Sequence, residues 1–179
     1  TYSKTYSVPA KEVVYQPKNQ EKLKEYLLVD GYNIIFAWED LKELAETNVE
    51  AARGKLLDML SNYQGYLKNT LIVVFDAYKV KGNPGSVTKY HNIYVVYTKE
   101  AETADQYIEK TVHEIGRKYQ VTVATSDALE QIIIWGQGAV RMSAQGLRRE
   151  MEECNPVRQE EFSQENPGAR YFPFEDLLK

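Results

Sequence analysis

Short apolar runs recur along the chain, separated by polar or turn-forming residues. Continuous apolar runs of this length are typical of strands that are buried on both faces of a sheet. We predict strands at residues 26–30, 71–76, 93–97, 121–125 and 138–142. Gly31 directly follows the first run, and we interpret it as the residue that stops this strand.

The segments between these runs favour helices. Thr47 and Glu50 have the spacing of a capping box, and apolar residues follow at helical spacing as far as Leu67. Thr103 and Gln106 form a second such pair, which predicts a helix as far as about residue 119. Two more helices are predicted, over 127–135 and from residue 143 onward.

This alternation of strands and helices predicts an α/β fold. The economical arrangement is a three-layer sandwich whose central sheet is mainly parallel, with right-handed connections. Only residues 79–89, between the second and third strands, are expected to form a loop. We expect residues 1–25 to be a linker or N-terminal arm, 26–155 to be the domain, and 156–179 to be an extension that packs on it.

Acidic residues follow the predicted strands. Asp30, Asp76 and Asp127 come at strand ends, and Asp105 lies in the first turn of the helix after the third strand. Ligands of open parallel sheets bind beyond the carboxyl ends of the strands, so these four acids are expected to meet at one edge. Clustered carboxylates repel each other unless a cation or protons accompany them.

Each acid alone also has a structural explanation. Asp127 could cap a helix, Asp105 suits a helix N-terminus, and Asp30 and Asp76 could be turn residues. Their joint placement favours a metal site instead. Carboxylates are hard oxygen ligands that suit Mg²⁺ or Mn²⁺, and such clusters cleave phosphodiesters. Asn33 is a neutral candidate to orient a ligand carboxylate or a water.

Composition limits the functions available to the chain. The chain has 179 residues and a net charge of −4, whereas nucleic-acid binders usually carry a basic surface. The substrate is therefore not nucleic acid, or the acids are concentrated in a metal site, or another particle presents the nucleic acid. Cys154 is the single cysteine, which fits a reducing compartment. No apolar run reaches membrane-spanning length, so we expect a cytoplasmic protein without membrane contact.

Four segments in order resemble the YacP-like NYN domains of the PIN-like nuclease superfamily. The resemblance runs from about residue 26 to 153, and a further segment at 143–147 also agrees with it. The four segments are Leu28-Val29-Asp30-Gly31-Tyr32-Asn33-Ile34-Ile35, Val74-Phe75-Asp76-Ala77, Thr98-Lys99-Glu100-Ala101-Glu102-Thr103-Ala104-Asp105 and Val123-Ala124-Thr125-Ser126-Asp127.

The resemblance implies a PIN-like fold and metal-dependent cleavage of RNA. It marks Asp30, Asp76, Asp105 and Asp127 as metal ligands, with Asn33 beside them. YacP-like proteins include endoribonucleases that act on messenger RNA at the ribosome, and similar domains occur fused behind GTPases that resemble ribosomal-protection proteins. The start at Thr1 and the polar arm are compatible with such a fusion.

Basic residues are the candidates for contacts with RNA. They fall on loops and helix starts that could flank the acids. The candidates are Lys79, Lys81, Lys89, Arg141, Arg148 and Arg149. Two other functions stay open at this point: an RNA- or ribosome-binding module that has lost catalysis, and a phosphohydrolase that acts on small phosphate esters.

Overall fold

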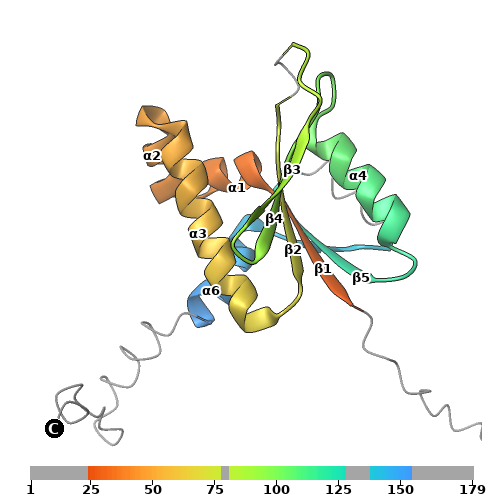
Figure 1. The fold of residues 1–179 in the computed structure, drawn as a ribbon. Helices are drawn as coiled ribbons and strands as arrows, with labels where there is room; N and C mark the ends of the chain where they lie inside the picture. The colour runs from red at the N-terminus through yellow and green to blue at the C-terminus, as the bar shows by residue number, and fades with distance from the viewer. Residues whose placement is uncertain (1–23, 78–80, 128–137, 155–179) are drawn as a thin grey trace, which may run out of the picture.

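The computed structural model describes residues 24–77, 81–127 and 138–154, which fold around a central sheet (Figure 1). The sheet has six strands in the order β3-β4-β2-β1-β5-β6. All neighbouring strands are parallel except β3 and β4. The strands are β1 (Glu25–Asp30), β2 (Thr70–Phe75), β3 (Ser86–Tyr90), β4 (Ile93–Tyr97), β5 (Gln120–Ala124) and β6 (Val140–Met142).

Helices cover both faces of this sheet. Figure 1 shows one group of helices on one face and α4 on the other. The first group is α1 (Gly31–Ala37), α2 (Glu39–Thr47), α3 (Val49–Leu67) and α6 (Ala144–Glu153), and α4 spans Ala104–Ile115. The predicted three-layer α/β sandwich with a mainly parallel sheet is therefore confirmed.

Two apolar cores explain why the strand sequences are continuously apolar. Side chains alternate between the faces of a strand. In β1, Leu27 and Val29 belong to the core beneath α1, α2, α3 and α6, whereas Leu28 belongs to the core beneath α4. All three are at most 2% exposed. A strand that is covered on both sides has no position for a solvated side chain.

The expected loop over 79–89 is wrong for its second half. Residues Ser86–Tyr90 form β3, which pairs antiparallel with β4 at the edge of the sheet. Four of its five residues are exposed, so the strand has no apolar run that could have revealed it. Gly85, at a φ of +75°, supplies the left-handed turn that leads into the strand.

Two helices, α1 and α2, were not predicted. Gly31 does follow the end of β1, but it also begins α1. The helix predicted at Thr47 is displaced, since Thr47 ends α2 and Asn48 caps α3 by accepting a hydrogen bond from the amide of Ala51 at 3.1 Å. The second capping box is confirmed. Thr103 accepts a hydrogen bond from the amide of Gln106, whose side chain accepts one from the amide of Thr103.

Several predictions lie outside the described residues. These are the N-terminal arm up to residue 23, the helix over 128–135 and the extension after residue 155. The helices that the structure does describe include none that is both long and apolar enough to cross a membrane.

Candidate active site at the carboxyl edge of the sheet

The register of the sheet brings three of the predicted acids to one edge. Asp30, the last residue of β1, pairs with Val74 of β2, and Val29 pairs with Ala124 of β5. Asp76 therefore follows the end of β2, and Asp127 lies three residues beyond the end of β5. Because all three strands are parallel, their carboxyl ends point to the same side of the molecule.

Asp30 and Asp76 lie where the sheet meets α4. Asp30 is 6% exposed and lies two residues after Leu28, so it lies on the same face of β1 as Leu28, whose side chain faces the core under α4. One carboxylate oxygen of Asp76 accepts a hydrogen bond from the amide of Ala104, the first residue of α4. The N-terminal amides of a helix lack partners within the helix, so this bond satisfies one of them. Asp76 thus joins β2 to the start of α4.

The charge of Asp105 acts on Asp76. Burial raises the pKa of the Asp76 carboxyl and the negative charge of Asp105 raises it further, while the hydrogen bond from Ala104 lowers it in part. Asp105, the second residue of α4, is half-buried. Two predicted site residues are therefore close enough to repel each other, and a bound cation would relieve this repulsion.

Asn33 positions the loop that carries Asp127. Its side-chain oxygen accepts a hydrogen bond of 2.7 Å from the amide of Ser126. The next amide, that of Asp127, donates to the hydroxyl of the fully buried Thr125 at 3.1 Å. The sequence suggested that Asn33 orients a ligand or a water. The structure shows its oxygen bonded to the backbone between the end of β5 and Asp127, and a role of Asn33 toward a ligand or a water stays a prediction.

The donor types at this edge fit a hard divalent cation, because carboxylate oxygens are the ligands that Mg²⁺ and Mn²⁺ prefer. Across the described ranges 24–77, 81–127 and 138–154, however, no three His, Cys, Asp or Glu side chains form a group that could hold one ion. The ligand set of Asp30, Asp76, Asp105 and Asp127 therefore stays a prediction.

Thr98 is a site residue that the sequence reasoning missed. It is 1% exposed and directly follows β4. Its hydroxyl accepts a hydrogen bond of 2.9 Å from the amide of Ala77, and its own amide donates to the carbonyl of Phe75 at 3.0 Å. These two bonds fix the backbone on both sides of Asp76. Its signal in the sequence is a polar residue directly after an apolar run, the same signal that identified the acids.

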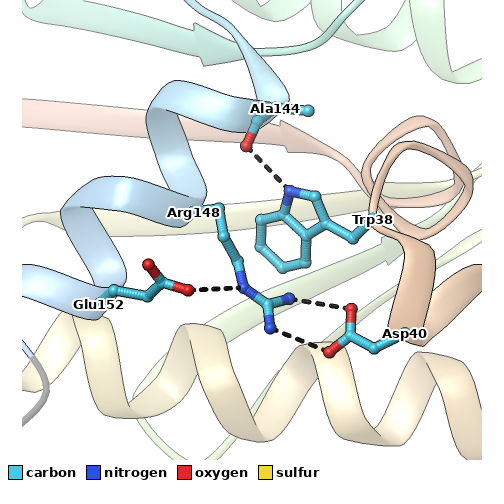
Figure 2. Close-up of polar contacts among 5 residues, drawn as sticks. All are labelled: Trp38, Asp40, Ala144, Arg148 and Glu152. Atoms are coloured by element: carbon cyan, nitrogen blue, oxygen red, sulfur yellow. Dashed lines mark hydrogen bonds and ion pairs between the residues drawn. The ribbon is translucent and has the colours of Figure 1, made fainter. Parts of the chain in front are cut away.

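Arg148, a candidate for contact with RNA, is engaged inside the protein (Figure 2). Its guanidinium donates to both carboxylate oxygens of Asp40, at 3.1 and 2.9 Å, and forms an ion pair with Glu152 at 3.5 Å. It also lies 4.7 Å from the centre of the Trp38 ring. These contacts favour a role in joining α2 to α6, and contact with RNA stays an untested prediction.

The other basic candidates are distributed around the sheet. Lys81 and Lys89 are exposed, and the Lys89 ammonium lies 5.8 Å from the centre of the Tyr94 ring. Arg141 is exposed on β6, and its Nε donates to the carbonyl of Thr125 at 3.4 Å. Arg141 is thereby placed next to the loop of Asp127. Arg149 is exposed on α6, and Lys79 lies outside the described residues.

Comparison with known proteins gives concordant matches. The family model of the YacP-like NYN domain matches residues 27–177. The YacP protein of Bacillus subtilis (strain 168) is 43% identical over 159 residues, a match that covers 87% of this chain and 93% of that protein.

Solved structures agree with these sequence matches. The crystal structure of Rae1 (YacP) from Bacillus subtilis is similar with a TM-score of 0.63 at 43% identity, and the match covers 86% of this chain and 90% of that one. A single-site mutant of the same protein gives a TM-score of 0.66 at 41% identity, with the same coverage. The similarity thus extends over most of both chains.

Proposed function

The chain belongs to the YacP-like NYN family, and on this premise we propose that it is a metal-dependent endoribonuclease that hydrolyses RNA phosphodiesters. The family supports a nuclease-type role. The observation that carries the finer proposal is the pair Asp76 and Asp105, which lie where the end of β2 contacts the start of α4. The pKa of Asp76 is raised by burial and by the charge of Asp105, as expected for carboxylates that are arranged to receive a cation.

In this proposal Asp30, Asp76, Asp105 and Asp127 hold Mg²⁺ or Mn²⁺. When bound, the ion would supply a polarised water and neutralise the charge that develops on the phosphate. The protein's own contribution is to hold these carboxylates in place, and the fold supports this. Asp30 and Asp76 are attached to adjacent buried strands, which are more rigid supports than loops.

Two neutral residues complete this support. Thr98 fixes the backbone beside Asp76, and Asn33 fixes the backbone beside Asp127. A hydrogen-bonded second layer keeps ligand groups in their productive geometry, and its loss typically lowers metal affinity or activity by about 10- to 100-fold.

We further propose that the substrate is messenger RNA presented by the ribosome. The net charge of −4 supports this, because an acidic domain gains little electrostatic attraction to RNA in solution. A particle that holds the RNA and docks the domain would replace electrostatic steering with positioning.

The direct test is cleavage of an end-labelled RNA with Mg²⁺ or Mn²⁺ and with EDTA. We expect cleavage that requires the metal and falls by at least about 100-fold in Asp30→Asn and Asp76→Asn, with the fold retained in circular dichroism. Glu114→Gln is the matched control, because it removes an exposed carboxylate near the far end of α4.

Three outcomes would contradict the proposal in different ways. RNA cleavage at the wild-type rate in Asp30→Asn would exclude the carboxyl edge of the sheet as the site of the reaction. Tight RNA binding without metal-dependent cleavage would indicate a binding module. Hydrolysis of p-nitrophenyl phosphate without cleavage of RNA would indicate a phosphohydrolase for small phosphate esters.

A further inference from the structure

Four aromatic rings form a continuous series beside the acidic edge. Phe36 and Tyr32 of α1 stack with ring centres 6.4 Å apart, and Tyr32 meets the ring of Phe75 edge-on at 5.1 Å. Phe75 in turn stacks with Tyr97 of β4 at 5.6 Å. These separations lie in the range in which aromatic pairs attract each other. Each ring therefore supports the orientation of the next.

Exposure changes along the series. Phe75 is fully buried, Tyr32 and Tyr97 are half-buried, and Phe36 is 55% exposed. From Phe75 through Tyr32 to Phe36 the series thus runs from the core to the surface, and it ends there in a ring that is open to solvent. Because its inner members are fixed by packing, little conformational entropy remains to be lost if a flat ligand extends the stack.

A positive charge lies within the same group. The guanidinium of Arg53, on α3, donates a hydrogen bond of 2.9 Å to the hydroxyl of Tyr32. Arg53 also forms an ion pair with Glu50 at 3.8 Å, and the Glu50 side chain is 87% exposed, so this ion pair is weak. An arginine in this setting can contact a phosphate with its remaining N–H groups.

The series and the acids share one edge of the sheet. Tyr32 lies two residues after Asp30, Phe75 directly precedes Asp76, and Tyr97 is the last residue of β4, paired with Phe75. Phe75 belongs to the core under α1, whereas Asp76 contacts the start of α4. The aromatic rings and the carboxylates therefore lie on opposite faces of the same strand ends.

We propose that Phe36, Tyr32 and Arg53 form a stacking platform that binds an unpaired base of single-stranded RNA next to the acidic edge. The proposal rests on the function proposed above and deepens it, since it names single-stranded RNA as the substrate class. Every base presents a π-face, so stacking binds single strands with little sequence preference. In a duplex these faces are already stacked, which makes paired RNA a poor ligand for this platform.

An exposed phenylalanine could also serve a protein partner. RNA is favoured because α1, which carries Tyr32 and Phe36, begins directly after Asp30, and because the charge of Arg53 matches a phosphate. The two tyrosines add polar tips to the group, as is common where bases stack in a wet site.

The test measures binding of a single-stranded oligoribonucleotide that carries one 2-aminopurine, whose fluorescence is quenched by stacking. The full chain is used in the Asp30→Asn background with Mg²⁺, so that the RNA stays intact. We expect Phe36→Leu to raise Kd by about 5- to 100-fold and to remove quenching, because leucine keeps the apolar bulk but not the ring. Phe36→Tyr should keep both properties.

Tyr66→Leu is the matched control. Tyr66 is an aromatic residue of α3 with 49% exposure, one residue before that helix ends, whereas Arg53 lies near its start. We expect Tyr66→Leu to bind and quench like the background protein. A duplex of the same sequence should bind more weakly than the single strand, and this preference should shrink in Phe36→Leu.

Unchanged Kd and quenching in Phe36→Leu would overturn the platform proposal and would favour a protein partner as the ligand of Phe36. Equal affinity for single-stranded and duplex RNA would overturn it as well. Failure of the proposed function gives a different result: the wild-type protein would not cleave RNA with Mg²⁺ or Mn²⁺, while quenching that depends on Phe36 would persist.

Discussion

Gly31 explains part of the Asp-Gly-Tyr-Asn segment in physical terms. A Cβ atom at this position would lie 2.3 Å from the ring of Phe75, a distance that no real side chain tolerates. Phe75 is fully buried and contacts both Tyr32 and Tyr97, so a shift of its ring would disturb these contacts. The glycine therefore permits α1 to begin directly against β2, which places Asp30 and Asn33 at the edge of the sheet.

We expect Gly31→Ala to lower the free energy of unfolding by about 1 to 3 kcal/mol, the usual cost of overpacking a core. Urea denaturation followed by circular dichroism measures this change. The matched control is Gly54→Ala in α3, where an added Cβ would meet no atom within 4 Å. It should stabilise the protein by about 0.5 to 1 kcal/mol, because alanine is the better helix former. Equal effects of the two variants would refute the packing argument.

Asn33 gives a second prediction for a single residue. Asn33→Ala removes the acceptor that holds the amide of Ser126, and with it the position of Asp127. We expect kcat for RNA cleavage to fall by about 10- to 100-fold while the melting temperature changes little. Ser126→Ala keeps the same backbone amide and should retain most of the activity. A large loss in Ser126→Ala together with full activity in Asn33→Ala would contradict this role.

At the scale of elements, one cluster connects α1, α2 and α6 (Figure 2). The indole N–H of Trp38, which is 3% exposed, donates to the carbonyl of Ala144 at 2.9 Å. Arg148 covers the same ring and binds Asp40 through two hydrogen bonds. Trp38 lies between α1 and α2, and Ala144 begins α6. The cluster therefore joins segments more than 100 residues apart in the sequence.

This cluster predicts a pH-dependent contribution to stability. Burial raises the pKa of Asp40, but the hydrogen bonds and charge of Arg148, together with the amide of Leu41 and the charge of Lys55, outweigh it, and the net pKa is lowered. A lowered pKa stabilises the folded state above the ordinary aspartate pKa of about 3.9, and this stabilisation is lost as the pH falls through the folded value. Asp40→Asn should therefore cost about 0.5 to 1 kcal/mol at pH 7, because the pair is partly solvated, and almost nothing near pH 2.

Glu39→Gln is the control for this prediction. It removes a charge from the same first turn of α2, so the two variants lose a similar interaction with the helix dipole. Urea denaturation at pH 7 and near pH 2 gives the comparison. Equal losses of unfolding free energy in both variants at pH 7 would show that the interaction between Asp40 and Arg148 does not stabilise the fold.

The sequence could predict elements whose patterns are local. Buried strands form apolar runs, and Thr103 with Gln106 makes a cap that depends only on neighbouring residues. It could not predict β3, because an exposed edge strand needs no apolar side chains and is defined by its pairing with β4. It also missed α1, because Gly31 is a weak helix former that is selected here by contact with a distant ring.

At the scale of the whole molecule, the sequence predicted which edge of the sheet carries the acids, but not the hydrogen bonds that hold the backbone there. Parallel strands bring Asp30, Asp76 and Asp127 to the same side, and this follows from the topology alone. The bonds of Asn33 to Ser126 and of Thr98 to Ala77 join segments that are distant in sequence, so no local pattern encodes them. The role of Arg148 was equally hidden, since its partner Asp40 lies on a helix that was not predicted.

The charge of the whole chain gives a prediction about how the substrate is presented. With a net charge of −4, the domain should cut naked RNA slowly and the same message on translating ribosomes faster. The measurement compares initial rates for one message, with and without ribosomes, at equal protein and Mn²⁺ concentrations. Equal rates would refute the ribosome proposal and leave the nuclease proposal intact.

The central claim is that the acids at the carboxyl edge of the sheet bind a divalent metal ion. Anomalous diffraction from crystals of the protein soaked in Mn²⁺ tests it most directly, because the signal locates the ion without any assay of activity. We predict an anomalous peak in direct contact with the carboxylates of Asp30 and Asp76, which is lost in Asp30→Asn crystals soaked in the same way. The absence of a peak at this edge in the wild-type protein, or its persistence in Asp30→Asn, would contradict the account.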